Sequence, residues 1–247
     1  TEDENGKIWL STKKDGVFVI AEDYILQLNS KNKLPDNNAY TVFADIDNKI
    51  WVGTRNGFTL IDNDSLTNNI HTEQNLYNQV KRFYRFNEKQ LWLGTRGNPF
   101  IYNEGKFIEV NIRIHAKDFC TDEHGYLWAG TVDEGLFKLK ITKDSIWKGT
   151  YKKYTEEHGL SNNYISELIY SHGYIWSGTY GGGINKFRVK GFNHITQNQG
   201  IGSELVWGFT EDENNDMWFA TETKGIGYLR DTLYYHFGKD SAGDPQC

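Results

Sequence analysis

The residues best placed to bind a ligand are six that hold the same place in a repeated pattern and differ in chemistry. Each follows the threonine of a five-residue motif whose other positions hardly vary. Packing does not constrain loops on a rigid repeat scaffold, so binding residues concentrate at such positions, although drift on a solvated loop explains the variation equally well. The six residues are Lys13, Arg55, Arg96, Val132, Tyr180 and Glu222.

Two of these residues, Arg55 and Arg96, could hold one anion between them, because a guanidinium binds a carboxylate or sulfate through two parallel hydrogen bonds. Tyr40, Tyr164 and Trp207 approach the same loops from the segments that precede the first strand of a repeat. Trp207 has no packing equivalent in the other repeats, so we expect it to be an aromatic platform. We hypothesise that these residues line one funnel for an anionic or oligosaccharide ligand, together with Lys13, Tyr180 and Glu222.

A repeat that covers nearly the whole chain predicts the elements that position these residues. An apolar residue precedes each tryptophan, a small residue (Gly, Ser or Ala) stands two positions after it, and threonine follows. Successive tryptophans are 42, 41, 36, 48 and 42 residues apart. A period near 40 residues indicates an array of supersecondary units. The repeated tryptophans are Trp9, Trp51, Trp92, Trp128, Trp176 and Trp218.

Each repeat contains four short runs of β-forming residues separated by turn residues, which is the content of one propeller blade. We therefore predict an all-β chain that forms a single β-propeller domain of about six four-stranded blades. The first blade lacks its inner strand, and the tail 238–247 is too rich in Gly, Asp and Pro to supply one. This favours a segment of a longer protein. The predicted blades are 1–36, 37–76, 77–111, 112–158, 159–200 and 201–247.

Composition excludes several classes of protein. The net charge of −6, without a cluster of Lys and Arg, argues against a nucleic-acid partner. No apolar run approaches the ~20 residues that span a bilayer, so we expect no membrane contact by this segment. Two cysteines are too few for a disulfide framework. No signal peptide heads the chain, which suits a cytosolic protein or a mature or excised piece.

Other conspicuous residues have structural explanations. A tryptophan at the same place in every blade is a packing residue between neighbouring blades. The turn that begins at Asp45 starts like a calcium loop, but the sixth position is Ile50 and no Glu stands at the twelfth. Turn chemistry explains such Asp-rich segments better than a bound cation does. The seven histidines lack metal spacing, and we find no cofactor motif and no catalytic motif.

The fifth repeat carries a specific resemblance. Leu160-Ser161-Asn162-Asn163-Tyr164-Ile165, followed by the segment 173–187 (Gly-Tyr-Ile-Trp-Ser-Gly-Thr-Tyr-Gly-Gly-Gly-Ile-Asn-Lys-Phe), resembles the two-component regulator propeller repeat. A second good match runs from Leu34 to Gly57, whereas the third and fourth repeats lack the Leu-(Ser/Pro)-x-Asn-Asn segment. The resemblance implies the periplasmic sensor region of hybrid histidine kinases of Bacteroidetes, many of which sense oligosaccharides. Arrays of that family are usually longer.

We therefore expect a non-catalytic sensor propeller, periplasmic or extracellular, that binds a small molecule or an oligosaccharide. Self-association, or packing against further repeats of the same protein, is a second kind of contact that we expect. Two alternatives stay open. One is a propeller-type polysaccharide lyase or glycoside hydrolase, which would need a His/Tyr or paired-carboxylate constellation in the funnel. The other is a protein-interaction platform that uses the rim of the propeller.

Overall fold

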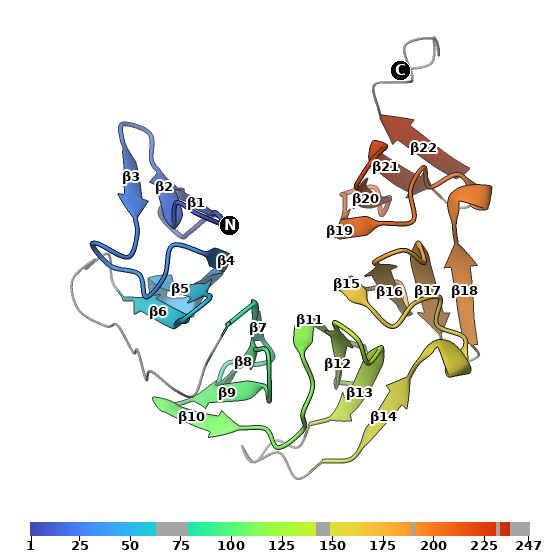
Figure 1. The fold of residues 1–247 in the computed structure, drawn as a ribbon, viewed down its shortest axis with the longest axis horizontal. Helices are drawn as coiled ribbons and strands as arrows, with labels where there is room; N and C mark the ends of the chain where they lie inside the picture. Colours follow the sequence, from blue (N-terminus) through green and yellow to red (C-terminus); the bar gives the residue numbers. More distant parts are fainter. Residues whose placement is uncertain (63–78, 142–148, 189–190, 231–232, 238–247) are drawn as a thin grey trace. The chain divides into compact units, whose positions relative to one another are not determined.

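The computed structural model describes residues 1–62, 79–141, 149–188, 191–230 and 233–237. Contacts between residues divide the chain into two compact units, Thr1–Ala116 and Lys117–Cys247. Regular structure in the described residues consists of β-strands and three short 3₁₀ turns, so the predicted all-β class is confirmed (Figure 1). None of the described helical segments is long and apolar enough to cross a membrane. The turns are η1 (Ile46–Asn48), η2 (Glu156–His158) and η3 (Gln197–Gln199).

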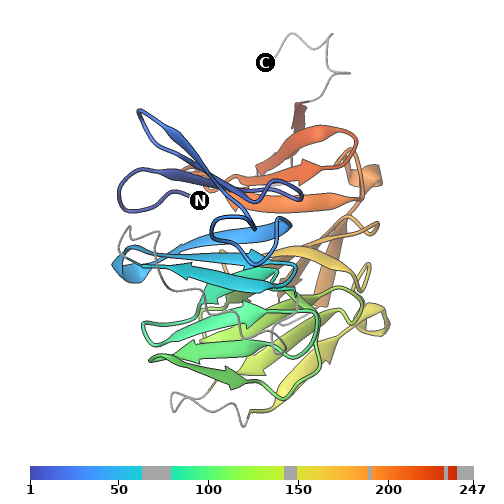
Figure 2. The same ribbon diagram turned by 60° about the vertical axis from the view of Figure 1, so that its left-hand side comes forward.

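The first unit contains three antiparallel sheets in which strands adjacent in sequence are hydrogen-bonded neighbours. Its first sheet has three strands, as predicted for a blade without an inner strand; the tail 238–247 lies outside the described residues. Strand β4 contacts both β1 and β7, so these sheets follow one another in chain order (Figure 1 and Figure 2). The strands are β1 (Ile8–Ser11), β2 (Val17–Ile20), β3 (Ile25–Leu28), β4 (Ala39–Asp45), β5 (Lys49–Thr54), β6 (Gly57–Ile61), β7 (Arg82–Arg85), β8 (Gln90–Gly94), β9 (Phe100–Asn103) and β10 (Lys106–Glu109).

The second unit contains three antiparallel sheets of four strands each. Strand β15 contacts β12 of the preceding sheet and β19 of the following one. Every described sheet of the chain falls within one predicted blade range, while the single domain remains a prediction. The strands are β11 (Ala116–Thr121), β12 (Tyr126–Thr131), β13 (Leu136–Lys140), β14 (Tyr151–Tyr154), β15 (Ile165–Ser171), β16 (Tyr174–Thr179), β17 (Ile184–Arg188), β18 (Gly191–Ile195), β19 (Val206–Glu211), β20 (Met217–Thr221), β21 (Gly225–Arg230) and β22 (Leu233–Phe237).

In four of the repeats the tryptophan fills the space between its own sheet and the next sheet of the same unit, as predicted. Trp51 of β5 packs with Phe83 and Leu93 of the next sheet, and Trp128 of β12 packs with Ile165 of β15. Rings of this size contribute most of the apolar area that such a core buries. Five of the six tryptophans are buried. Substitution of one of them by alanine is therefore a large-to-small core change.

Trp218 departs from this pattern, because it is only partly buried. Its cover comes from within its own sheet, where the ring stacks on Tyr228 at 4.8 Å and on Phe237 at 5.8 Å between centroids. The expectation that all six tryptophans are largely buried thus holds less well for the last repeat.

An aspartate six residues before the tryptophan accepts the indole N–H in four of the repeats, and in three of them it also holds the backbone of the turn. One carboxylate oxygen accepts the indole N–H, at 2.9 Å from Asp122 to Trp128, and the other accepts the backbone N–H groups of His124 and Tyr126. Turn chemistry therefore explains these aspartates, as the sequence predicted. Asp3–Trp9 and Asp212–Trp218 are equivalent pairs. Asp45 also accepts the indole N–H of Trp51, but its other oxygen binds Arg85 of the next sheet instead of the turn backbone.

The hydrogen bonds also set the acidity of this carboxylate. Burial raises the pKa of Asp122, but the indole of Trp128, the backbone of Tyr126 and the ammonium of Lys138 act against burial, so the pKa lies below its ordinary value. The ammonium of Lys138 lies 3.1 Å from the carboxylate. The charged form of Asp122 is thus part of the folded structure.

Candidate ligand-binding surface

The repeated threonine closes the loop that carries each predicted binding residue. Its hydroxyl donates to a backbone carbonyl three or four residues later, for example from Thr54 to Gly57 at 2.9 Å and from Thr179 to Gly183 at 2.8 Å. The six predicted loop residues all lie in these connections. The connection joins the second and third strands of a sheet, or the first and second strands in the first sheet, which lacks an inner strand. A short, internally bonded loop holds its side chains with little ordering cost on binding.

Main-chain hydrogen bonds join three of these loops to the start of the first strand or to the segment before it. The N–H of Arg55 donates to Asn38, that of Tyr180 to Tyr164, and that of Glu222 to Leu205, each at 3.0 Å. Predicted residues from the two kinds of segment therefore lie on the same edge of their sheets.

A β-bulge recurs one residue into the first strand. The pairing register shifts between Ala39 and Thr41, between Ile165 and Glu167, and between Val206 and Gly208. The extra residue on the bulged strand is Tyr40, Ser166 or Trp207 respectively. Because a bulge bends the strand and re-aims the side chain of the extra residue, it explains how Tyr40 and Trp207 come to be exposed on strands whose next neighbours pack into the core.

In the second unit the structure brings three predicted residues together. The ring centroid of Tyr180 lies 5.1 Å from that of Tyr164 and 5.8 Å from that of Trp207. Tyr180 and Trp207 expose 45% and 46% of their surface, which leaves ring area for a ligand. Burial, and then the neighbouring Tyr180, raises the pKa of Tyr164, so its hydroxyl stays neutral. We call Tyr164, Tyr180 and Trp207 the aromatic triad.

Lys117 adds a cation to the aromatic triad. Its ammonium lies 5.0 Å from the ring centroid of Tyr164 and 5.8 Å from that of Trp207, within the range of cation–π attraction. The sequence reasoning missed Lys117. The signal was present, because Lys117 stands eleven residues before Trp128, as Trp207 does before Trp218.

The other predicted residues are distributed over both units. Lys13, Tyr40, Arg55 and Arg96 belong to the first unit, and Glu222 lies in the second unit on the loop after β20. That these residues share one funnel with the aromatic triad remains a prediction, as does a single anion held by Arg55 and Arg96.

A second cation that sequence reasoning missed lies beside Arg96. Lys81 occupies the position equivalent to Tyr40, eleven residues before Trp92. Burial lowers the pKa of the Lys81 ammonium, and repulsion from Arg96 lowers it further. The two like charges favour an anion at this edge of the third sheet. Within the described residues, no group of three His, Cys, Asp or Glu side chains is placed to hold a metal ion.

Solved structures of known proteins share this architecture. An extracellular domain of BT4673 from B. thetaiotaomicron, assigned to a one-component system, superposes with a TM-score of 0.62 at 18% identity, over 97% of this chain and 43% of that chain. A second BT4673 structure, assigned to a hybrid two-component system, gives a TM-score of 0.53 at 18% identity, over 95% and 40%. The WD40 β-propeller domain of Doa1 gives 0.65 at 12% identity, over 95% and 80%.

These likenesses show that the chain has the fold of a β-propeller, as the repeat predicted. Residues 33–56 match the model of the two component regulator propeller family, which confirms the resemblance in the second repeat. No curated protein matches the chain. The chain spans less than half the length of the BT4673 structures that it matches.

Proposed function

We propose that this chain is the ligand-binding propeller of an extracellular or periplasmic two-component sensor, and that the aromatic triad binds an oligosaccharide. The sensor role is supported by the repeat match at residues 33–56 and by the BT4673 domains, which are extracellular. The observation that carries the binding role is the exposed pair of Tyr180 and Trp207 beside the ammonium of Lys117.

The chemistry of the triad suits a sugar ring. The C–H-rich face of a pyranose packs on an indole or phenol face, and the Tyr hydroxyls and the Lys117 ammonium provide hydrogen-bonding groups for sugar hydroxyls. Trp207 exposes 46% of its surface, and a tryptophan has up to about 250 Å² to bury. Covering this ring would contribute at most roughly 3 kcal/mol to binding.

The test is binding of neutral and acidic oligosaccharides to the whole chain by isothermal titration calorimetry. Trp207→Ala and Tyr180→Ala should each weaken the binding of a sugar by about tenfold or more, while the melting temperature stays nearly unchanged. Tyr24→Ala is a matched control, because Tyr24 is also 46% exposed but belongs to the first unit, whereas the triad belongs to the second. Unchanged affinity in both triad variants would exclude the triad as the sugar site.

The same titrations test the enzyme alternative. A lyase would release products with unsaturated-sugar absorbance, and a glycoside hydrolase would release new reducing ends. Binding without release of product supports the sensor. Release of product by fractions that contain the purified chain, in proportion to its amount, supports the enzyme.

A further inference from the structure

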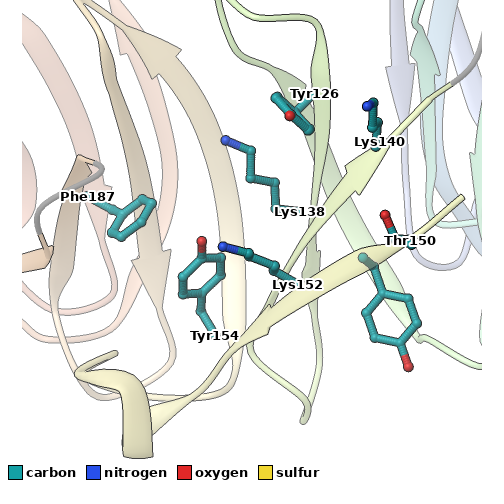
Figure 3. Close-up of a pocket in the computed structure, with 8 residues that line it drawn as sticks. Tyr126, Lys138, Lys140, Thr150, Lys152, Tyr154 and Phe187 are labelled. Carbon is teal, nitrogen blue, oxygen red and sulfur yellow. The ribbon is translucent and has the colours of Figure 1, made fainter.

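A second concave site lies in the second unit, at the edge of the fourth sheet opposite the loop that follows Thr131. It has a volume of about 430 Å³, within the range of small-molecule sites. Strands β12, β13 and β14 provide most of its wall, and β17 of the next sheet provides the rest (Figure 3). Six residues that define its chemistry are Tyr126, Lys138, Lys140, Lys152, Tyr154 and Phe187.

The strand register gathers three lysines on one face of this sheet. Lys138 of β13 pairs with Lys152 of β14, and Lys140, two residues further along β13, pairs with Tyr126 of β12. Because alternate residues of a strand share a face, all three lysines face the same way. Figure 3 shows Lys138 and Lys152 extending in the same direction from their strands, toward Tyr154 and Phe187. Like charges directly opposite each other destabilise a sheet, so this arrangement has no structural advantage.

Among the described residues, acidic side chains compensate only one of these charges. Lys138 forms an ion pair with Asp122 at 3.1 Å, and its ammonium lies 4.1 Å from the ring centroid of Tyr126. Lys140 and Lys152 are exposed, and in the part of the chain that the structure describes neither has an acidic partner within ion-pair distance. Counted over the described residues that line it, the pocket therefore has an excess of two positive charges in a protein whose net charge is −6.

The aromatic side of the pocket is rigid. Tyr154 stacks on Trp128 with centroids 5.6 Å apart and an interplanar angle of 22°, and its ring lies 5.1 Å from that of Phe187. Burial raises the pKa of Tyr154, so its hydroxyl remains a neutral donor and acceptor. A ligand would meet a fixed phenol beside two uncompensated ammonium groups.

The next sheet contains an equivalent groove that serves as an internal comparison. Lys186 of β17 lies 4.3 Å from the ring centroid of Tyr174 and 4.5 Å from that of Trp176, as Lys138 does with its own tyrosine and tryptophan. This groove has a volume of about 290 Å³. A lysine over this pair of rings is thus part of how both sheets pack.

The two grooves differ on the fourth strand. Register places Asn193 opposite Lys186, where the fourth sheet has Lys152, and Ile195 opposite Ile184, where the fourth sheet has Tyr154. The repeat architecture therefore forms without Lys152 and without Tyr154. These two residues distinguish the larger pocket. Tyr154 also packs on Trp128 and Phe187, whereas the repeat does not require a lysine at the place of Lys152.

We propose that this pocket binds a small anionic ligand, with its negative group between Lys140 and Lys152 and a ring-sized body against Tyr154. The volume admits a molecule of monosaccharide or disaccharide size. Two ammonium groups recognise a carboxylate, a sulfate and a phosphate alike. A lysine acts as a point charge and, unlike an arginine, does not select an anion by two parallel hydrogen bonds. The proposal is independent of the aromatic triad, which lies at the opposite edge of its sheets.

The experiment measures the binding of glucuronate, glucose 6-sulfate, glucose 6-phosphate and glucose to the whole chain by calorimetry at low ionic strength. At least one of the three anions should bind more tightly than glucose, and its identity names the anionic group. Lys152→Ala and Lys140→Ala should each weaken that binding by about tenfold or more, the range of one charge-assisted contact. Both side chains are exposed, so both variants should fold.

Arg188→Ala is the matched control, because Arg188 stands two residues after Lys186, as Lys140 does after Lys138, and its guanidinium lies over the ring of Tyr174, which lines the equivalent groove. Its affinity for the anion should equal that of the parent chain. The proposal is wrong if no anion binds more tightly than glucose, if the two lysine variants bind as tightly as the parent, or if Arg188→Ala loses as much affinity as they do. The last result would indicate a general charge effect.

Discussion

Replacement of Asp45 by alanine should destabilise the first unit more than any other single change in the Asp–Trp turns. Only 1% of the Asp45 side chain is exposed. Its carboxylate accepts the indole N–H of Trp51 at 2.9 Å and also binds the guanidinium of Arg85, which comes from the next sheet. The substitution therefore leaves both the indole N–H of Trp51 and the guanidinium of Arg85 without their acceptor.

The structure allows the magnitude to be worked out from these two losses. Trp51 is fully buried, so its indole N–H would lose its acceptor out of reach of water, at about 1–3 kcal/mol. Breaking a buried ion pair costs about 3–5 kcal/mol, but 20% of the Arg85 side chain is exposed and water can partly replace the carboxylate. We therefore expect a total loss of about 3–5 kcal/mol for Asp45→Ala. Asp45→Asn, which keeps an acceptor for the indole, should lose less.

The assay is equilibrium unfolding in urea, followed by tryptophan fluorescence, with Asp212→Ala as the control. Asp212 makes the same bond to its indole, at 2.8 Å, and also accepts the backbone N–H groups of Asn214 and Asp216. Trp218 is partly exposed, however, and Asp212 has no ion pair equivalent to that of Asp45 with Arg85 among the described residues, so water can replace the lost acceptor. Asp45→Ala should lower the unfolding midpoint clearly more than Asp212→Ala. Equal effects would refute the reasoning, because they would mean that neither burial nor Arg85 adds to the cost.

Three further predictions concern acidity and backbone geometry. Because the pKa of Asp122 is lowered in the folded state, its carboxylate stabilises the fold above the unfolded-state pKa of 3.8, and this stability is lost as pH falls through the folded-state pKa. Asp122→Asn should therefore make the free energy of unfolding, measured in urea titrations, depend less on pH below about pH 4. Gly135→Ala should lower the melting temperature far more than Gly125→Ala. Both glycines have positive φ, so the backbone strain is similar, but only at Gly135 would the new Cβ clash with a backbone carbonyl oxygen, at 2.2 Å. Arg96→Ala should raise the pKa of Lys81, seen by NMR titration of the lysine side chain, and an unchanged pKa would show that burial alone lowers it.

The number and order of the sheets were predictable because the residues that recur in the sequence repeat are the ones that pack between sheets. Trp51 and Trp128 mark the second strand of their sheets, and their burial between neighbouring sheets follows from their flanking apolar residues. The members of the aromatic triad were predictable for the opposite reason, since Tyr180 and Trp207 stand where the repeat does not require an aromatic residue.

Residues whose role depends on register could not be predicted in this way. Lys117 stands eleven residues before Trp128, as Trp207 does before Trp218, but its proximity to Tyr164 and Trp207 shows only when neighbouring sheets are placed together. Lys152 faces Lys138 only because of the pairing between β13 and β14, and the length of their connection hides that pairing. Both are cations beside aromatic rings, a combination that appears only when strands are placed side by side.

The hydrogen bonds that build the loop edge explain why its side chains vary in chemistry while the backbone does not. Where the loop joins the first strand, the scaffold uses the main-chain N–H of Arg55, Tyr180 and Glu222 and main-chain carbonyls on the other side. The loop is closed by the threonine hydroxyl one residue earlier, not by these side chains. A cation, an aromatic ring or a carboxylate can therefore occupy the position without disturbing the sheet. A binding surface on this scaffold needs only side-chain substitutions at the loop residue and at the residue eleven positions before the repeated tryptophan, and in the second unit those two positions supply Tyr180, Trp207 and Lys117 to one cluster.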